Sequence, residues 1–147
     1  MANFQKSLDI VIAEYDEDDY LLIAEAIKKE GDVGFIHWVK DGEELLNYLD
    51  ACDKLDNSPE KNPSLIILDL NMPKKDGREA LDEIKTHPKR KSIPIIILTT
   101  SQADADINQA YQLEANSFIQ KPFKYADFKS TMEALQKYWL SIVKLPT

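Results

Sequence analysis

The sequence has few of the residues on which several protein classes depend. Its 147 residues include one cysteine, Cys52, and four glycines. One cysteine excludes an internal disulfide framework and is typical of a reducing, cytoplasmic environment. So few glycines leave no phosphate loop of the GxxxxGK or GxGxxG type, which argues against nucleotide binding. No apolar run approaches the ~18 residues of a membrane helix, and the first seven residues lack the pattern of a signal peptide.

Basic residues are also scarce. The chain has 18 Lys plus Arg against 26 Asp plus Glu, which gives a formal net charge of -8. Such a chain repels nucleic-acid phosphates, so we expect no direct DNA binding. Residues 1–76 hold 18 acids and 8 bases, whereas residues 77–147 hold 8 acids and 10 bases. The 44% hydrophobic content is that of a globular protein with a substantial core.

Five short apolar segments alternate with five segments of helical periodicity. The predicted strands are Leu8 to Ala13, Val33 to Val39, Leu65 to Leu68, Ile93 to Leu98 and Ser117 to Ile119. Three of them are continuous runs rich in β-branched residues, which is typical of parallel strands covered on both faces. The alternation predicts a single α/β domain over residues 1–147, with a core at about 8–138 and a C-terminal extension at 139–147. Asp53 to Pro63 is predicted to be an exposed loop.

Polar residues follow the predicted strands at their carboxyl ends, where open parallel sheets bind ligands. Glu14 follows the first strand, Asp69 the third, Thr99 the fourth and Lys121 stands just after the fifth. Two carboxylates favour a hard cation such as Mg2+, and a hydroxyl and an ammonium are suited to phosphoryl oxygens. Each residue alone is more often a helix cap or a solvated side chain. Their joint occurrence at one edge of the sheet predicts phosphoryl transfer.

Four motifs in this order resemble those of two-component receiver domains. They are Leu65 to Pro73 (LIILDLNMP), Asp76-Gly77, Pro94 to Thr100 (PIIILTT) and Gln120 to Phe123 (QKPF). The resemblance covers about residues 8–138 and implies a flavodoxin-like (βα)5 sandwich with a parallel sheet of order 2-1-3-4-5. The loop before the third strand and the C-terminal residues 138–146 are similar to the small stand-alone receivers that partner phytochrome-type sensor kinases.

The resemblance implies a role for each residue of the site. Asp69 would take a phosphoryl group from the phosphohistidine of a sensor histidine kinase. Glu14, Asp69 and the backbone carbonyl of Asn71 would hold Mg2+. Lys121 would pair with the phosphoryl oxygens, and the Thr99 hydroxyl would turn inward to one of them.

Two further expectations come from the resemblance. Phe118 occupies the position of the aromatic residue that follows the switch hydroxyl inward on activation. A phenylalanine has no hydroxyl, so it would report the switch by packing alone. The peptide bond between Lys121 and Pro122 would be cis and would orient the lysine.

Tyr15 departs from the family pattern, which has two adjacent acids after the first strand. Asp16 does not restore the pair by a shift of one residue, because such a shift would turn every side chain of the strand to the opposite face. The loss of a ligand acid predicts weaker Mg2+ binding and slower phosphorylation. The alternative is that the tyrosine packs over the pocket mouth and the metal still binds. Residues 16–19, all acidic, are predicted to be a solvated helix cap.

The C-terminal residues are the predicted output surface. Phe128, Met132 and Leu135 continue a helical stripe that should cover the sheet. Beyond it, Tyr138, Trp139, Ile142 and Val143 form an apolar set that predicts a homodimer interface, the alternative being a tail that folds back on its own domain.

The leading hypothesis is a single-domain response regulator that signals through protein contacts and catalyses only its own phosphorylation and dephosphorylation. A pseudo-receiver scaffold without phosphoryl chemistry is the alternative, favoured by Tyr15. A hydrolase-like phosphatase is disfavoured, because Asn71 stands where its second acid would be. Cys52, His37 and His87 are isolated and show no metal-ligand spacing.

Overall fold

The predicted strands form one parallel sheet in the computed structural model, which describes residues 8–28, 33–55, 62–101 and 103–138. The strands are β1 (Leu8–Ala13), β2 (Val33–Val39), β3 (Leu65–Leu68), β4 (Ile95–Thr99) and β5 (Ser117–Gln120). They lie in the order β2-β1-β3-β4-β5, and each neighbouring pair is parallel. The order confirms the predicted flavodoxin-like topology.

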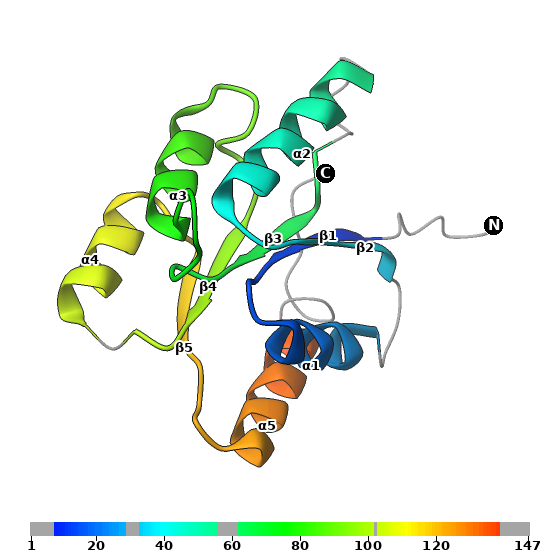
Figure 1. Ribbon diagram of the computed structural model, residues 1–147, viewed down its shortest axis with the longest axis vertical. Coiled ribbons are helices and arrows are strands. Elements are labelled where there is room, and N and C mark those ends of the chain that lie inside the picture. Colours follow the sequence, from blue (N-terminus) through cyan, green and yellow to red (C-terminus); the bar gives the residue numbers. More distant parts are fainter. Residues whose placement is uncertain (1–7, 29–32, 56–61, 102, 139–147) are drawn as a thin grey trace.

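Five helices cover the two faces of the sheet. They are α1 (Glu17–Lys28), α2 (Gly42–Leu55), α3 (Gly77–Thr86), α4 (Asp104–Gln112) and α5 (Tyr125–Leu135). Figure 1 shows α1 and α5 together on one face and α2, α3 and α4 on the other. None of the helices in the described part of the chain has the length and apolar character needed to cross a bilayer.

The core consists of two apolar clusters, one on each face of the sheet. Val11 and Ala13 point into the cluster shared with α2, α3 and α4, whereas Ile10 and Ile12 point into the one shared with α1 and α5. Residues 10–13 of β1 thus alternate between the two helix layers, and all residues of β3 and β4 are buried, which explains why these three segments are continuous apolar runs. The predicted stripe on the last helix is confirmed, because Phe128, Met132 and Leu135 are all buried.

Strand β4 begins and ends later than predicted. It starts at Ile95 rather than Ile93, because Pro94 has no N–H for the ladder and the Ile93 N–H is donated to the Arg90 carbonyl at 3.0 Å. It ends at Thr99, which pairs with Gln120, so β4 and β5 each extend one residue further at the carboxyl end. Thr99 is thus held within a strand.

Helix α2 extends to Leu55. The prediction of a loop from Asp53 is therefore wrong for its first three residues, which are helical. Asp50 and Asp53 lie on the same face of α2, three residues apart, and both contact the Nη2 atom of Arg90 at 2.6 Å. Arg90 is buried, so these contacts favour helical structure up to Leu55. Residues 56–61 of the predicted loop lie outside the described residues.

Candidate functional site

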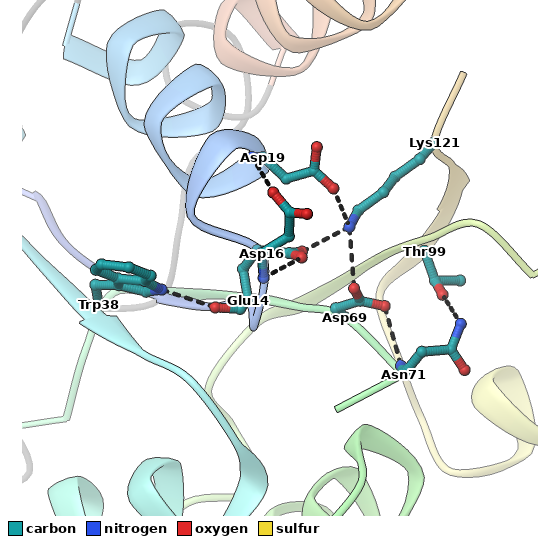
Figure 2. Close-up of polar contacts among 8 residues, drawn as sticks. All are labelled: Glu14, Asp16, Asp19, Trp38, Asp69, Asn71, Thr99 and Lys121. Carbon is teal, nitrogen blue, oxygen red and sulfur yellow. Dashed lines mark hydrogen bonds and ion pairs between the residues drawn. The ribbon is translucent and has the colours of Figure 1, made fainter. Parts of the chain in front are cut away.

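The sheet brings the predicted site residues to one edge, at the carboxyl ends of β1, β3, β4 and β5. Backbone hydrogen bonds continue the ladder into the site: the Asp69 N–H donates to the Ala13 carbonyl at 3.0 Å, and the Lys121 N–H donates to the Thr99 carbonyl at 2.7 Å. Because each site residue directly follows or ends a buried strand, its backbone is held by the sheet itself. Figure 2 shows the side chains converging from these strands.

Lys121 is the centre of the site. Its Nζ lies 2.7 Å from Glu14 Oε2, 3.0 Å from Asp69 Oδ2 and 3.0 Å from Asp19 Oδ2 (Figure 2). Lys121, Glu14 and Asp69 are buried, with exposed fractions of 3%, 3% and 6%. When all three carboxyls are ionised, they carry two negative charges more than the one ammonium compensates. Such a cluster is costly away from water and favours any additional cation.

Asp69 and Thr99 are connected through Asn71. The Asn71 backbone N–H donates to Asp69 Oδ1 at 3.0 Å, and its side-chain Nδ2 donates to Thr99 Oγ1 at 3.2 Å. Asp69 Oδ1 and Oδ2 are therefore engaged by Asn71 and Lys121, respectively, and this orients the carboxylate. The Thr99 hydroxyl is fully buried and contacts Asn71 rather than Asp69.

Burial and charge shift two pKa values in the site. The pKa of Glu14 is raised from 4.5 to about 8, because the carboxyl is buried and faces Asp69, while Lys121 opposes the shift. Burial lowers the pKa of Lys121, but the carboxylates of Asp69 and Glu14 outweigh this, so its pKa is raised and the ammonium stays charged. The upward shift at Glu14 thus comes first from its burial and second from the neighbouring Asp69 carboxylate.

The acidic cluster after β1 is not the uniformly solvated cap that its sequence predicted. Asp16 does cap α1, since its Oδ1 accepts the Asp19 N–H at 3.0 Å. Asp19, however, turns into the site and contacts Lys121. Residue spacing along the helix does not show which of these acids faces the sheet, so the sequence offered no signal for this contact.

Tyr15 lies at the rim of the site. It is 61% exposed, so most of its side chain faces solvent, and it supplies no carboxylate. Glu14, directly before it, is buried. At the two positions after β1, the site therefore contains one acid where the family pattern has two.

A divalent cation fits the chemistry of this edge. All the nearby acceptors are oxygens, which hard cations prefer, and a divalent ion would balance the two excess negative charges of the fully ionised cluster. Within the described residues, no three His, Cys, Asp or Glu side chains are arranged around a common metal position. The acids instead direct oxygens at Lys121. The residues that would hold the cation are the predicted ones, Glu14, Asp69 and the Asn71 carbonyl.

Other predicted residues have different outcomes. The predicted cis bond is wrong: the Lys121–Pro122 peptide is trans, the generally favoured form, and the lysine reaches the carboxylates without it. Phe118 lies in β5, is half-buried and packs against the cluster of α2, α3 and α4. Tyr138 is 54% exposed, and Trp139, Ile142 and Val143 lie outside the described residues.

The fold and the site define a receiver domain, and comparison with known proteins agrees. The model of the response regulator receiver domain matches residues 10–133. This chain belongs to that family, whose members are signalling proteins of two-component systems.

Two curated relatives match nearly the whole chain. The response regulator Rcp1 of Synechocystis sp. is 36% identical over 137 residues, covering 93% of this chain and 92% of the relative. The probable methanogenesis regulatory protein FilR2 of Methanothrix harundinacea is also 36% identical over 137 residues, covering 93% of this chain and 86% of the relative.

Two solved structures are similar throughout. The Mn2+-bound form of Rcp1 has a TM-score of 0.86 at 35% identity and covers 95% of this chain and 99% of its own. The phosphorylated cyanobacterial phytochrome response regulator RcpA has a TM-score of 0.86 at 36% identity, with the same coverage. Relatives of this chain thus include a phytochrome response regulator, a metal-bound form and a phosphorylated form.

Proposed function

We propose that this chain is a response regulator that accepts a phosphoryl group on Asp69 from the phosphohistidine of a sensor histidine kinase. The supporting observation is the buried Asp69 carboxylate, held by Lys121 at 3.0 Å and by the Asn71 N–H at 3.0 Å. An oxygen of Asp69 forms a bond to phosphorus as the phosphorus–nitrogen bond of the phosphohistidine breaks, and its electron pair returns to the imidazole.

The residues around Asp69 have separate tasks in this step. Lys121 stays charged and neutralises phosphoryl oxygens next to Asp69. Thr99 would leave Asn71 and donate its hydroxyl to a phosphoryl oxygen, with Phe118 repacking behind it. Glu14, Asp69 and the Asn71 carbonyl would hold Mg2+, which neutralises developing phosphoryl charge when bound. Hydrolysis of the aspartyl phosphate then returns the site to its starting state.

The Mn2+-bound Rcp1 and phosphorylated RcpA support this proposal over a pseudo-receiver scaffold. Asp69, Thr99 and Lys121 are all present and buried. Because Tyr15 contributes no acid, we propose a weaker Mg2+ site than two adjacent acids would make. The similarity to RcpA favours a phytochrome-type kinase as the donor. The free cysteine, Cys52, is compatible with a cytoplasmic location.

Phosphorylation is tested by incubating the chain with acetyl phosphate and Mg2+ and measuring the intact mass. We expect the added mass of one phosphoryl group on the wild type and none on Asp69→Ala. The adduct should form more slowly at low Mg2+ concentration, since the site lacks one acid. A wild type that gains no mass at any Mg2+ concentration would establish the scaffold function instead.

We also propose that the domain of residues 8–138 is joined to a C-terminal extension that forms a homodimer. The support is the apolar set Tyr138, Trp139, Ile142 and Val143 in the sequence. In sedimentation, we expect the full chain to be dimeric and a chain ending at Lys137 to be monomeric. A shortened chain that still dimerises would place the interface elsewhere.

A further inference from the structure

Trp38 contacts the backbone of the site. Its indole Nε1–H donates to the Glu14 carbonyl oxygen at 2.7 Å (Figure 2). The Glu14 N–H donates to the Val39 carbonyl at 3.0 Å. Both polar groups of the Glu14 backbone are therefore held by β2, one by its backbone and one by its indole. Glu14, where β1 gives way to the loop, is thus held on both sides: the backbone of β2 holds the Ala13–Glu14 peptide through its N–H, and the indole holds the Glu14–Tyr15 peptide through its carbonyl.

The indole is itself held in place. The ring of Tyr20, from α1, stacks on it with ring centroids 4.3 Å apart and planes within 4°. Lys40 Nζ lies 5.0 Å from the centre of the ring. These contacts come from different elements, so the indole plane is set by α1 and by the end of β2 together. The stack and the cation hold the ring in its plane, and within that plane the N–H points to the Glu14 carbonyl.

The position of Glu14 matters more here than in a site with two adjacent acids. Glu14 is the acid retained at the two positions after β1, and its carboxylate contacts Lys121 at 2.7 Å. Its other oxygen accepts the Asp16 N–H at 3.2 Å, so the carboxylate and the start of α1 are connected. A displacement of the Glu14–Tyr15 peptide would move the carboxylate and the cap of α1 together.

We propose that Trp38 is a positioning residue for the phosphorylation site, acting through its indole N–H on the Glu14–Tyr15 peptide. This inference rests on the proposed function, because Glu14 is taken to hold the divalent cation. Trp38 touches neither the phosphoryl group nor the cation. It determines where Glu14 lies, the one acid at the two positions directly after β1.

The test is Mg2+ affinity measured by calorimetry on Trp38→Phe, which keeps an aromatic ring against Tyr20 and removes the N–H. We expect the dissociation constant to rise about 10-fold, as is typical when a group supporting a metal ligand is lost. Phosphorylation by acetyl phosphate should be slow at low Mg2+ and recover at saturating Mg2+, since the defect lies in the position of a ligand. Phe35→Leu, on the same strand but without contact to Glu14, is the control and should match the wild type.

A second variant, Tyr20→Leu, keeps the indole N–H and removes the ring that sets its plane. It should weaken Mg2+ binding in the same direction by a smaller factor, and it decides the question if Trp38→Phe does not fold. If the folded variants bind Mg2+ within about twofold of the wild type and lose only thermal stability, the positioning role is overturned. If the wild type itself binds no Mg2+ and gains no phosphoryl group, the proposed function fails instead, and the two failures are distinguishable.

Discussion

Lys121→Met is expected to stop phosphoryl acceptance while tightening divalent-cation binding. The ammonium of Lys121 contacts the carboxylates of Glu14, Asp19 and Asp69. Without it, these three carboxylates face one another. The uptake of phosphoryl from acetyl phosphate should fall about 100-fold, the usual effect of removing a group that stabilises transition-state charge. Mg2+ no longer competes with an ammonium, so calorimetry should show a lower dissociation constant. A variant that loses both phosphoryl acceptance and Mg2+ binding would contradict the assignment of these two functions to different residues.

The same variant should be destabilised in a pH-dependent manner. Breaking a buried ion pair by removing one partner costs about 3–5 kcal/mol. The pKa of Glu14 is already raised from 4.5 to about 8, so in the wild type its contribution to stability is complete below pH 4.5 and is lost as the pH rises through 8. Lys121 lowers this pKa, so in its absence the pKa of Glu14 rises further and the loss of stability continues to higher pH. Urea denaturation at pH 5 and pH 8.5 should therefore show a larger deficit at pH 8.5.

Lys129→Met is the matched control for both measurements. Lys129 is exposed on α5 and lies outside the site, so its replacement should change the free energy of unfolding by less than about 0.5 kcal/mol at either pH. A control that changed as much as the Lys121 variant would assign the effect to net charge rather than to the buried cluster.

Gly77→Ala is expected to damage the fold and the site at once. A Cβ at this position would lie 2.2 Å from the Asp69 carbonyl oxygen and 2.7 Å from Leu70 Cα. Both are backbone atoms, so the start of α3 must move away from the strand end that carries Asp69. The Gly77 N–H bond to the Leu70 carbonyl, 3.0 Å long, would be lost as well. We expect a loss of about 3 kcal/mol, at the upper end for overpacking.

Urea denaturation and acetyl phosphate labelling together test this prediction. The variant should lose stability and also label more slowly than the wild type under conditions where both are folded, because the Asp69 backbone has shifted. Glu79→Ala, an exposed change in the first turn of the same helix, should have little effect on either measurement. If Gly77→Ala labels at the wild-type rate, α3 yields without disturbing Asp69, and the coupling is absent.

Much of the fold was predictable from the sequence because its signals are local. The buried strands are continuous β-branched runs, and parallel strands of this kind must be covered by helices on both faces. The carboxyl ends of parallel strands share one edge, so Glu14, Asp69, Thr99 and Lys121 had to lie near one another. The structure places Glu14, Asp69 and Lys121 in direct contact and Thr99 one hydrogen bond away through Asn71.

The wrong predictions concern the start of β4, the end of α2 and the Lys121–Pro122 peptide. The missing N–H of Pro94 delays the start of β4, a signal that was present in the sequence. The length of α2 depends on a buried arginine about 40 residues away, which no local pattern shows. The predicted cis peptide rested on family resemblance rather than on the residues themselves, and the trans form satisfies the same contacts.

The sequence by itself determined the α/β class, the edge of the sheet at which Glu14, Asp69, Thr99 and Lys121 gather, and the departure at Tyr15, because strand patterns and residue order suffice for these. The strand order 2-1-3-4-5 was implied by the resemblance to receiver domains, and the structure confirms it. Only the tertiary structure decided which of the clustered acids faces Lys121 and what holds the Glu14 backbone. Asp19 turns into the site and Asp16 caps the helix because α1 packs against β2 through the stack of Tyr20 on Trp38. The rotation of a helix at the edge of a sheet is set by such long-range contacts, and residue spacing along the helix leaves it open.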